Sequence, residues 1–385
     1  FHQNKYMSAT KDSFAQHKRT EYESHLPFDV ESWYPLLQDM TAESSFLPFN
    51  NDICEAIIHY YQSRFNSCEN FTQKDLETLK NLEKNIQKNI QNFPEAFVRL
   101  SSRSPKDGMI LNSPDLTKEY QQKKEELFEK FPPANEAERA NLSMVAVSQV
   151  QAKYLLVRNS HEAMNLLLTS ERVFVDLIRL QSMDTQNWKM NFISRRWNPD
   201  IRDDLEFRLF VKEEKILCIS QYNHYCVFPQ ILIKYGAEQC PEGHKMLKEK
   251  LIEIWKIAHE KLLECDEQVF VSAYKNGYIL DIGIIENDDG SLSGTIIELN
   301  PFERTTGACL FTWGVIDSLG EGEMKEEVEL RFLEIPRENI SDLVNDVILP
   351  ALSATERPYY DFFPQEEEVQ NTETFLQRWL RPFFG

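Results

Sequence analysis

The sequence predicts an α+β protein with antiparallel sheets, and two patterns lead to this prediction. Apolar residues recur at helical spacing in the first part of the chain and again over 241–263, which is typical of amphipathic helices. Short β-prone runs separated by turn-length gaps follow residue 200. Helices first, then a hairpin, a helix and a second hairpin indicate an α+β architecture with an antiparallel sheet.

Helices are expected mainly before residue 170. Their signals are apolar residues three and four positions apart, or a charged, solvent-facing pattern closed by prolines. A short β-prone run between them, 97–100, is expected to be a strand that opens into a serine-rich loop. The expected helices of this part are 52–65, 75–90, 116–130 and two within 134–170.

Strands are expected mainly after residue 170. Clean alternation over 205–212, followed by a hairpin-length gap before 216–221, predicts an antiparallel pair. A second hairpin is expected where the turn at 287–290 joins two strands. The expected strands are 174–180, 188–197, 205–212, 216–221, 269–273, 278–285 and 294–299.

Composition disfavours several functional classes. The 385 residues include 12 glycines and no G-x-x-x-x-G-K-[ST] or G-x-G-x-x-G motif, so a glycine-rich phosphate loop is not expected. A formal net charge of −20 would repel nucleic acid and anionic membranes, and neither is expected as a direct partner. Seven scattered cysteines without a C-x-x-C pair, and no apolar stretch near the roughly 18–20 residues of a membrane span, favour a cytoplasmic protein.

Three oxygen-bearing side chains are candidates for a divalent metal site. Glu298 and Asn300 are two apart on one expected strand and share a face, and Asp281 can reach the same point from the paired strand. Two carboxylates and an amide suit a hard cation such as Mg²⁺, which prefers oxygen ligands and nucleotide phosphates. The alternative is an ordinary strand pair with acids on a solvent face.

Six basic residues lie in strands and loops where an anion can bind. Arg208 lies inside an expected strand, where an unpaired buried charge costs on the order of 3–5 kcal/mol. It therefore meets either an anion or an acid in a cross-strand salt bridge, Glu206 or another, and the sequence leaves both open. Against the acidic background the cations predict a focused positive pocket that suits a polyphosphate with Mg²⁺. They are Arg99, Arg103, Lys106, Arg195, Arg196 and Arg208.

Four blocks of sequence occur in a characteristic order between about residues 28 and 316. They are 32–35, 99–107, 206–212 with 219–221, and 298–302 through 310–313. In this order they resemble the cell division cycle protein 123 family, an unusual branch of the ATP-grasp fold. The combination is specific, although each block alone is a weak signal.

The resemblance implies a fold and a ligand. The expected fold has two lobes with antiparallel sheets that enclose a nucleotide cleft, with extra helices, ATP between the lobes and Mg²⁺ near the 298–302 block. It also gives each matched position a role. Arg99, Ser104 and Lys106 would contact phosphate, Ser194, Arg195 and Arg196 would form the hinge between the lobes, Glu206, Arg208 and Ser220 would face the nucleotide, and Asp281, Glu298 and Asn300 would hold the metal.

The resemblance also divides the chain into parts. Two positions depart from the family pattern, because Arg99 stands where lysine is common and Glu298 where aspartate is common. The helical insertion is longer than expected, and the aromatic and basic end at 378–384 differs from the family's usual acidic tail. The expected parts are a poorly ordered extension (1–27), an N-terminal lobe (28–190) with the insertion at about 113–151, a C-terminal lobe (191–316) and a C-terminal extension (317–385).

The function implied by the resemblance is assembly of a translation factor. It is that of a cytoplasmic chaperone, connected with the cell cycle, that binds ATP and Mg²⁺ and promotes assembly of translation initiation factor 2 through its gamma subunit. The alternative is an ATP-grasp enzyme, a ligase or kinase, that activates an unknown acceptor by phosphoryl transfer. A degenerate fold that binds no nucleotide is the third possibility.

Overall fold

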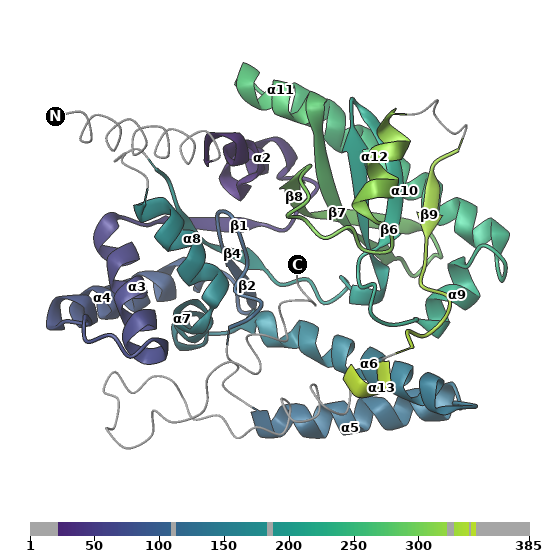
Figure 1. Ribbon diagram of the computed structural model, residues 1–385, viewed down its shortest axis with the longest axis horizontal. Coiled ribbons are helices and arrows are strands. Elements are labelled where there is room, and N and C mark those ends of the chain that lie inside the picture. The colour runs from purple at the N-terminus through teal and green to yellow at the C-terminus, as the bar shows by residue number, and fades with distance from the viewer. Residues whose placement is uncertain (1–21, 109–112, 183–187, 322–326, 339, 344–385) are drawn as a thin grey trace, which may run out of the picture.

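The strands of the protein form two sheets, each at the centre of one lobe (Figure 1). The computed structural model describes residues 22–108, 113–182, 188–321, 327–338 and 340–343. Neighbouring strands in both sheets are antiparallel, except that β6 and β9 run parallel. The α+β class with antiparallel sheets is therefore confirmed.

The N-terminal lobe has a four-stranded sheet with the order β1-β4-β2-β3, and its helices bury their apolar sides in one core. Helix α4 shows why the sequence pattern works here: Thr72 and Asp75 form a capping box at its start, and Leu79 and Ile86 are fully buried. The elements are β1 (Ser44–Pro48), α3 (Asn51–Phe65), α4 (Gln73–Ile90), β2 (Ala96–Leu100), β3 (Leu156–Val157), α7 (Ser160–Thr169), α8 (Glu171–Gln181) and β4 (Asn191–Arg196).

The C-terminal lobe has a five-stranded sheet with the order β8-β7-β5-β6-β9. Phe207 and Leu209 of β5 share a core with the buried side of the long helix α10. Because side chains alternate along a strand, Arg208 and Phe210 face the other way, where Phe210 packs against the segment that follows β8. The elements are β5 (Glu206–Lys212), β6 (Lys215–Gln221), α9 (Pro229–Tyr235), α10 (Pro241–Leu263), α11 (Gln268–Asn276), β7 (Gly277–Glu286), β8 (Leu292–Pro301), α12 (Trp313–Glu321) and β9 (Glu329–Arg331).

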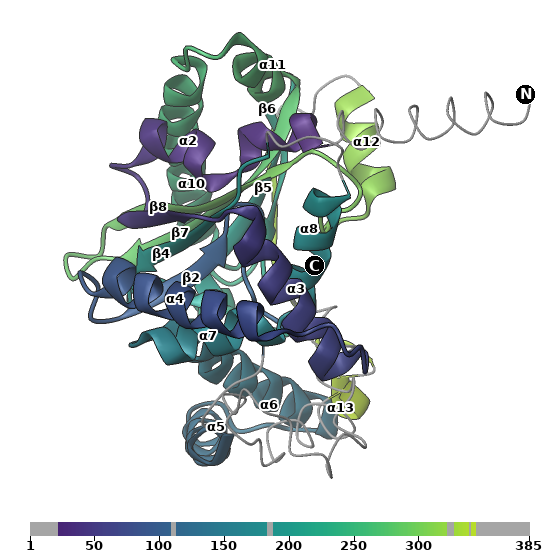
Figure 2. The same ribbon diagram turned by 90° about the vertical axis from the view of Figure 1, so that its left-hand side faces the viewer.

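The predicted helical insertion forms the pair α5 (Ser113–Lys130) and α6 (Glu136–Gln151) at the end of the molecule opposite α11 (Figures 1 and 2). Met144 and Val145 of α6 belong to the same core as the C-terminal sheet. Asn141 donates to the Val227 carbonyl at 2.9 Å and accepts from the Val227 amide at 2.8 Å. The insertion is thus fastened to the second half of the chain, next to the short helix α13 (Ile340–Leu343).

The aromatic block at 32–35 lies in helix α2 (Val30–Leu37), which follows a 3₁₀ turn (Leu26–Phe28). Trp33 is fully buried, and its indole nitrogen donates to the Phe28 carbonyl at 3.2 Å. Tyr274 of α11 donates its hydroxyl to the Pro27 carbonyl at 2.8 Å. These aromatic rings join the core of the C-terminal sheet although the block comes early in the sequence.

Two of the predicted strands are wrong. Residues 174–180 lie in α8, where Ser170 caps the helix by accepting from the Val173 amide and Leu177 is buried one turn later. Residues 269–273 lie in α11, which ends at Gly277 with φ of +155°. Both runs contain several β-prone apolar residues, but an amphipathic face and end signals decide in favour of a helix.

Candidate functional site

Charged side chains gather where the loop after β2 meets the C-terminal sheet. The Arg99 guanidinium of β2 pairs with Glu298 of β8, with 2.7 Å between Nη2 and Oε1. The Lys106 ammonium of the loop donates to the Tyr222 hydroxyl, just after β6, at 3.0 Å. These contacts cross from one lobe to the other, so the cluster lies between the lobes.

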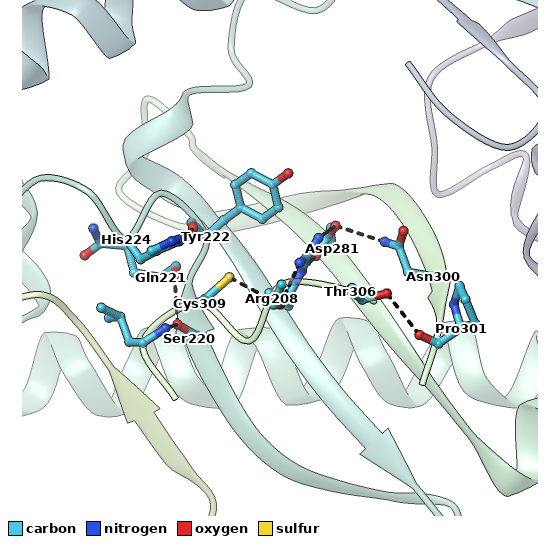
Figure 3. A network of polar contacts seen from close by, with 12 residues as sticks. Arg208, Ser220, Gln221, Tyr222, His224, Asp281, Asn300, Pro301, Thr306 and Cys309 are labelled. Carbon is cyan, nitrogen blue, oxygen red and sulfur yellow. Dashed lines mark hydrogen bonds and ion pairs between the residues drawn. The ribbon is translucent and has the colours of Figure 1, made fainter. Parts of the chain in front are cut away.

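Arg208 and Asp281 form a buried pair at the centre of this cluster (Figure 3). They lie opposite each other on β5 and β7. Arg208 donates Nε to Oδ1 at 2.8 Å and Nη2 to Oδ2 at 2.9 Å, and the two side chains are only 3% and 1% exposed. Of the alternatives left open for Arg208, the structure has the cross-strand salt bridge, with Asp281 rather than Glu206 as the acid.

Burial and pairing together set the charge of this pair. Burial alone would lower the pKa of Arg208, but the facing Asp281 carboxylate raises it well above the ordinary value. The Tyr222 ring, whose centroid is 4.8 Å from the guanidinium carbon, supplies a further favourable contact. Arg208 is therefore held as a cation, and its remaining Nη1 donates to the Gly307 carbonyl at 2.8 Å.

Arg99 is the second buried cation of the cluster. Its Nε donates to the Leu100 carbonyl and its Nη2 to the Ser102 carbonyl, both at 3.0 Å, in addition to the pair with Glu298. Burial would raise the pKa of Glu298, but Arg99, then Lys106 and Arg208, outweigh it and lower that pKa to about 2. Glu298 is thus an anion at neutral pH, set against cations from both lobes.

Glu206 behaves differently from Glu298 although it lies in the same cluster. Burial raises the pKa of Glu206 to about 8, and the nearby Lys106 offsets this effect only in part. At neutral pH Glu206 therefore holds a proton and can donate a hydrogen bond, whereas Glu298 can only accept. Glu206 and Glu298 therefore have opposite hydrogen-bonding roles in the site.

Two aspartates fix the loop that carries Lys106. Asp176 of α8 accepts from the Ser102 hydroxyl at 2.6 Å and from both Arg103 Nε and Nη2. Asp107 accepts from the Ser170 hydroxyl at 2.5 Å and from the Arg172 amide at 3.0 Å. Arg103 is consequently committed to Asp176, and the start of α8 sets the position of the whole loop.

Several other predicted site residues have separate partners. The Ser194 hydroxyl donates to Asn89 at 2.5 Å, and Arg195 donates to the Ile297 carbonyl at 2.7 Å. Arg196 is exposed and pairs with Glu43. Ser104 is buried in the loop, and Ser220 accepts from the Leu310 amide at 3.1 Å. Arg195 therefore connects the two lobes, whereas Ser194 and Arg196 pair with residues of the N-terminal lobe.

The three predicted metal ligands do come together. Asp281 and Glu298 are partners in the register of β7 and β8, and the Asn300 amide donates to Asp281 Oδ2 at 3.3 Å. Their oxygen donors fit a hard divalent cation, although each carboxylate already faces a guanidinium. Within the described part of the chain, no group of three or more histidine, cysteine, aspartate or glutamate side chains is placed to hold a metal ion.

Tyr222 is a site residue that the sequence reasoning missed. It touches Lys106 through its hydroxyl and Arg208 through its ring face, so it connects the cations of the two lobes. A signal for it exists, because Ser220 lies opposite Arg208 in the hairpin and Tyr222 follows two residues later on the same side.

The fold and this cluster define a two-lobed α+β protein with buried, paired charges at the junction of its sheets. A family model described as D123 matches residues 140–351, which is more than half of the chain. The chain therefore belongs to the D123 family, and the resemblance to the cell division cycle protein 123 family is confirmed.

A curated relative and two solved structures are similar to the chain. "Translation initiation factor eIF2 assembly protein" from Candida albicans is 28% identical over 178 residues, 43% of this chain and 45% of that protein, so the match spans less than half of the relative. The structure of Cdc123 from Schizosaccharomyces pombe has a TM-score of 0.49 at 16% identity, covering 79% of this chain and 94% of that one. The structure of the C-terminally truncated form of that protein has a TM-score of 0.49 at 16% identity, and the match covers 80% of this chain and 96% of that one. Among the residues that the structure describes, no helix is long and apolar enough to cross a membrane.

Proposed function

We propose that the protein is a cytoplasmic, ATP-grasp-like assembly factor that binds ATP with Mg²⁺ and promotes assembly of translation initiation factor 2 through its gamma subunit. The observation that carries the ligand proposal is the cluster of Arg99, Lys106 and Arg208 with Asp281 and Glu298 at the junction of the lobes. The partner is proposed from family membership and from the name of the Candida albicans relative.

The cluster is chemically suited to a metal-bound polyphosphate. Planar guanidinium groups recognise phosphate oxygens through two parallel hydrogen bonds, and Lys106 adds a compact charge. Asp281, Glu298 and Asn300 would hold Mg²⁺, which neutralises phosphate charge when bound. Asp176 and Asp107 keep the Lys106 loop in place. The lobes meet at this point, so a ligand here can set the surface offered to a partner.

Calorimetric titration of ATP, with and without Mg²⁺, tests the ligand. The full chain is expected to bind ATP in the presence of Mg²⁺, and Lys106→Met is expected to weaken this binding at least about tenfold, because it removes one charge-assisted contact. Arg158→Gln, which alters an exposed pair with Glu95 in the N-terminal lobe, is the matched control. If ATP with Mg²⁺ does not bind to the wild type, the nucleotide proposal is wrong.

A second experiment separates an assembly factor from an enzyme. The protein is mixed with ATP, Mg²⁺ and the isolated gamma subunit, and both complex formation and release of ADP or AMP are measured. A stable complex without turnover supports assembly. Turnover that depends on an added acceptor supports the ligase or kinase alternative, for which Arg99, Lys106 and Arg208 would stabilise the transferred phosphoryl group.

A further inference from the structure

Each carboxylate that is a candidate metal ligand already holds a cation of the chain itself. Both oxygens of Asp281 accept from Arg208, at 2.8 and 2.9 Å, and Glu298 Oε1 accepts from Arg99 at 2.7 Å. The Asn300 amide group also donates toward Asp281. A divalent cation can use these oxygens fully only after the guanidinium groups have moved away.

The same holds for the candidate phosphate ligands. Arg208 uses Nε and Nη2 for Asp281 and Nη1 for the Gly307 carbonyl, and Arg99 uses Nη2 for Glu298 and Ser102. Both arginine side chains are 3% exposed. A polyphosphate can approach these guanidinium groups only if the two carboxylates find another positive partner.

We propose that a metal-bound polyphosphate replaces the pairs Arg99–Glu298 and Arg208–Asp281 together, so that phosphate takes the arginines while the divalent cation takes the acids. The inference rests on the proposed function and describes how the binding of the two ligands at that site is regulated. A metal alone would leave two buried guanidinium groups unpaired, and a polyphosphate alone would leave two buried carboxylates beside it. When both enter, every buried charge keeps an opposite partner, so each ligand strengthens the binding of the other by the same factor.

The exchange also acts on the junction of the lobes. Three consecutive residues of β8 contact the N-terminal half: the Ile296 amide donates to the Met40 carbonyl at 2.7 Å, the Ile297 carbonyl accepts from Arg195, and Glu298 pairs with Arg99. Only the third contact is exchanged. The backbone contact and the Arg195 contact remain, so the exchange changes the link between the lobes at Glu298 and leaves them joined beside it.

Metal binding without nucleotide provides the decisive measurement. Free Mn²⁺, observed by electron paramagnetic resonance, is titrated into the full chain alone and in the presence of ATP, and ATP is titrated in the presence of EDTA. We expect each ligand alone to bind about 100-fold more weakly than in the presence of the other, the upper part of the range usual for coupled sites. Equal affinities for Mn²⁺ with and without ATP would overturn the exchange.

The variant Arg208→Gln tests the exchange from the other side, because it frees one carboxylate before any ligand binds. This variant frees Asp281, so Mn²⁺ alone is expected to bind at least about tenfold more tightly than to the wild type, while ATP with Mn²⁺ binds more weakly. Arg99→Gln, which frees the 16%-exposed Glu298, is the second variant if Arg208→Gln does not fold. Arg158→Gln is the control and should leave Mn²⁺ binding unchanged. Failure of both site variants to strengthen Mn²⁺ binding contradicts the inference.

The two proposals fail in different ways. If ATP and Mn²⁺ do not bind to the wild type even together, the proposed nucleotide function is wrong. If they bind together but also bind independently with unchanged affinities, the nucleotide function stands and only the exchange of partners is wrong.

Discussion

Replacing Asp281 by asparagine is expected to destabilise the protein substantially. The side chain keeps its shape but loses the charge that faces Arg208 through two hydrogen bonds of 2.8 and 2.9 Å. Removing one partner of a buried pair usually costs about 3–5 kcal/mol, because the other charge stays buried. Arg208 keeps the Gly307 carbonyl and the face of the Tyr222 ring, which offsets about 1 kcal/mol. We therefore expect a net loss of about 3 kcal/mol.

Urea denaturation followed by tryptophan fluorescence at pH 7 measures this loss. Two variants serve as references. Glu95→Gln breaks the exposed pair with Arg158, whose side chains are 43% and 59% exposed, and should cost less than about 1 kcal/mol. The double variant Arg208→Met with Asp281→Leu removes both charges and should recover most of the stability, because no charge remains unpaired.

The outcome that refutes this reasoning is specific. If Asp281→Asn costs no more than Glu95→Gln, the Arg208–Asp281 pair is not a desolvated pair of charges. The same result would remove the energetic reason for a coupled exchange of partners in the site. A large loss in the single variant that the double variant does not recover would instead point to packing rather than charge.

Two further predictions concern stability away from the Arg208–Asp281 pair. Burial, followed by the neighbouring Asp204, raises the pKa of Asp203 to about 7, so the native state retains a proton that an unfolded chain releases near pH 4. Stability should therefore fall between about pH 4 and 7, and urea denaturation across this range should show a flatter profile for Asp203→Asn. A Cβ on Gly243 would overlap the Lys234 carbonyl oxygen between α10 and α9, so Gly243→Ala should cost about 1–3 kcal/mol in thermal melts. Gly314→Ala, where the nearest atom is 4.0 Å away, should not.

The secondary structure was predictable where an apolar pattern repeated over several turns of a helix, or where two alternating runs were joined by a hairpin turn. Helix α4 buries residues along its predicted stripe, and the β5–β6 and β7–β8 hairpins follow from alternation and turn-length gaps. The predictions for 174–180 and 269–273 failed because a mainly apolar run of five to seven residues fits a strand and a buried helix face equally well. Strands β1 and β9 were missed because they are short and pair with strands far away in the sequence.

The members of the site were more predictable than their pairing. Residue types indicated that Arg208 needs an acid or an anion, but the acid lies 73 positions away, beyond three helices. Only the register of β5 and β7 selects Asp281. Arg99 and Glu298 form their ion pair because the two lobes are in contact there. The contact between the lobes cannot be predicted from any short stretch of sequence. Tyr222 could have been found from the face it shares with Ser220 once Ser220 was placed opposite Arg208.

Six basic residues in strands and loops predicted a positive pocket within a protein of net charge −20, and the contacts change what this prediction means for ligand binding. Arg99 and Arg208 each face a carboxylate, and Lys106 donates to a phenol beside a Glu206 that is mostly protonated at pH 7. The cluster thus carries three cations against two anions and is nearly balanced. Counting basic residues therefore overstates its attraction for an anion. A polyphosphate therefore gains little binding free energy from the electrostatic field of the site. It gains more by replacing the carboxylates as the partners of the arginines, and this replacement requires a divalent cation that binds with it and pairs with the carboxylates.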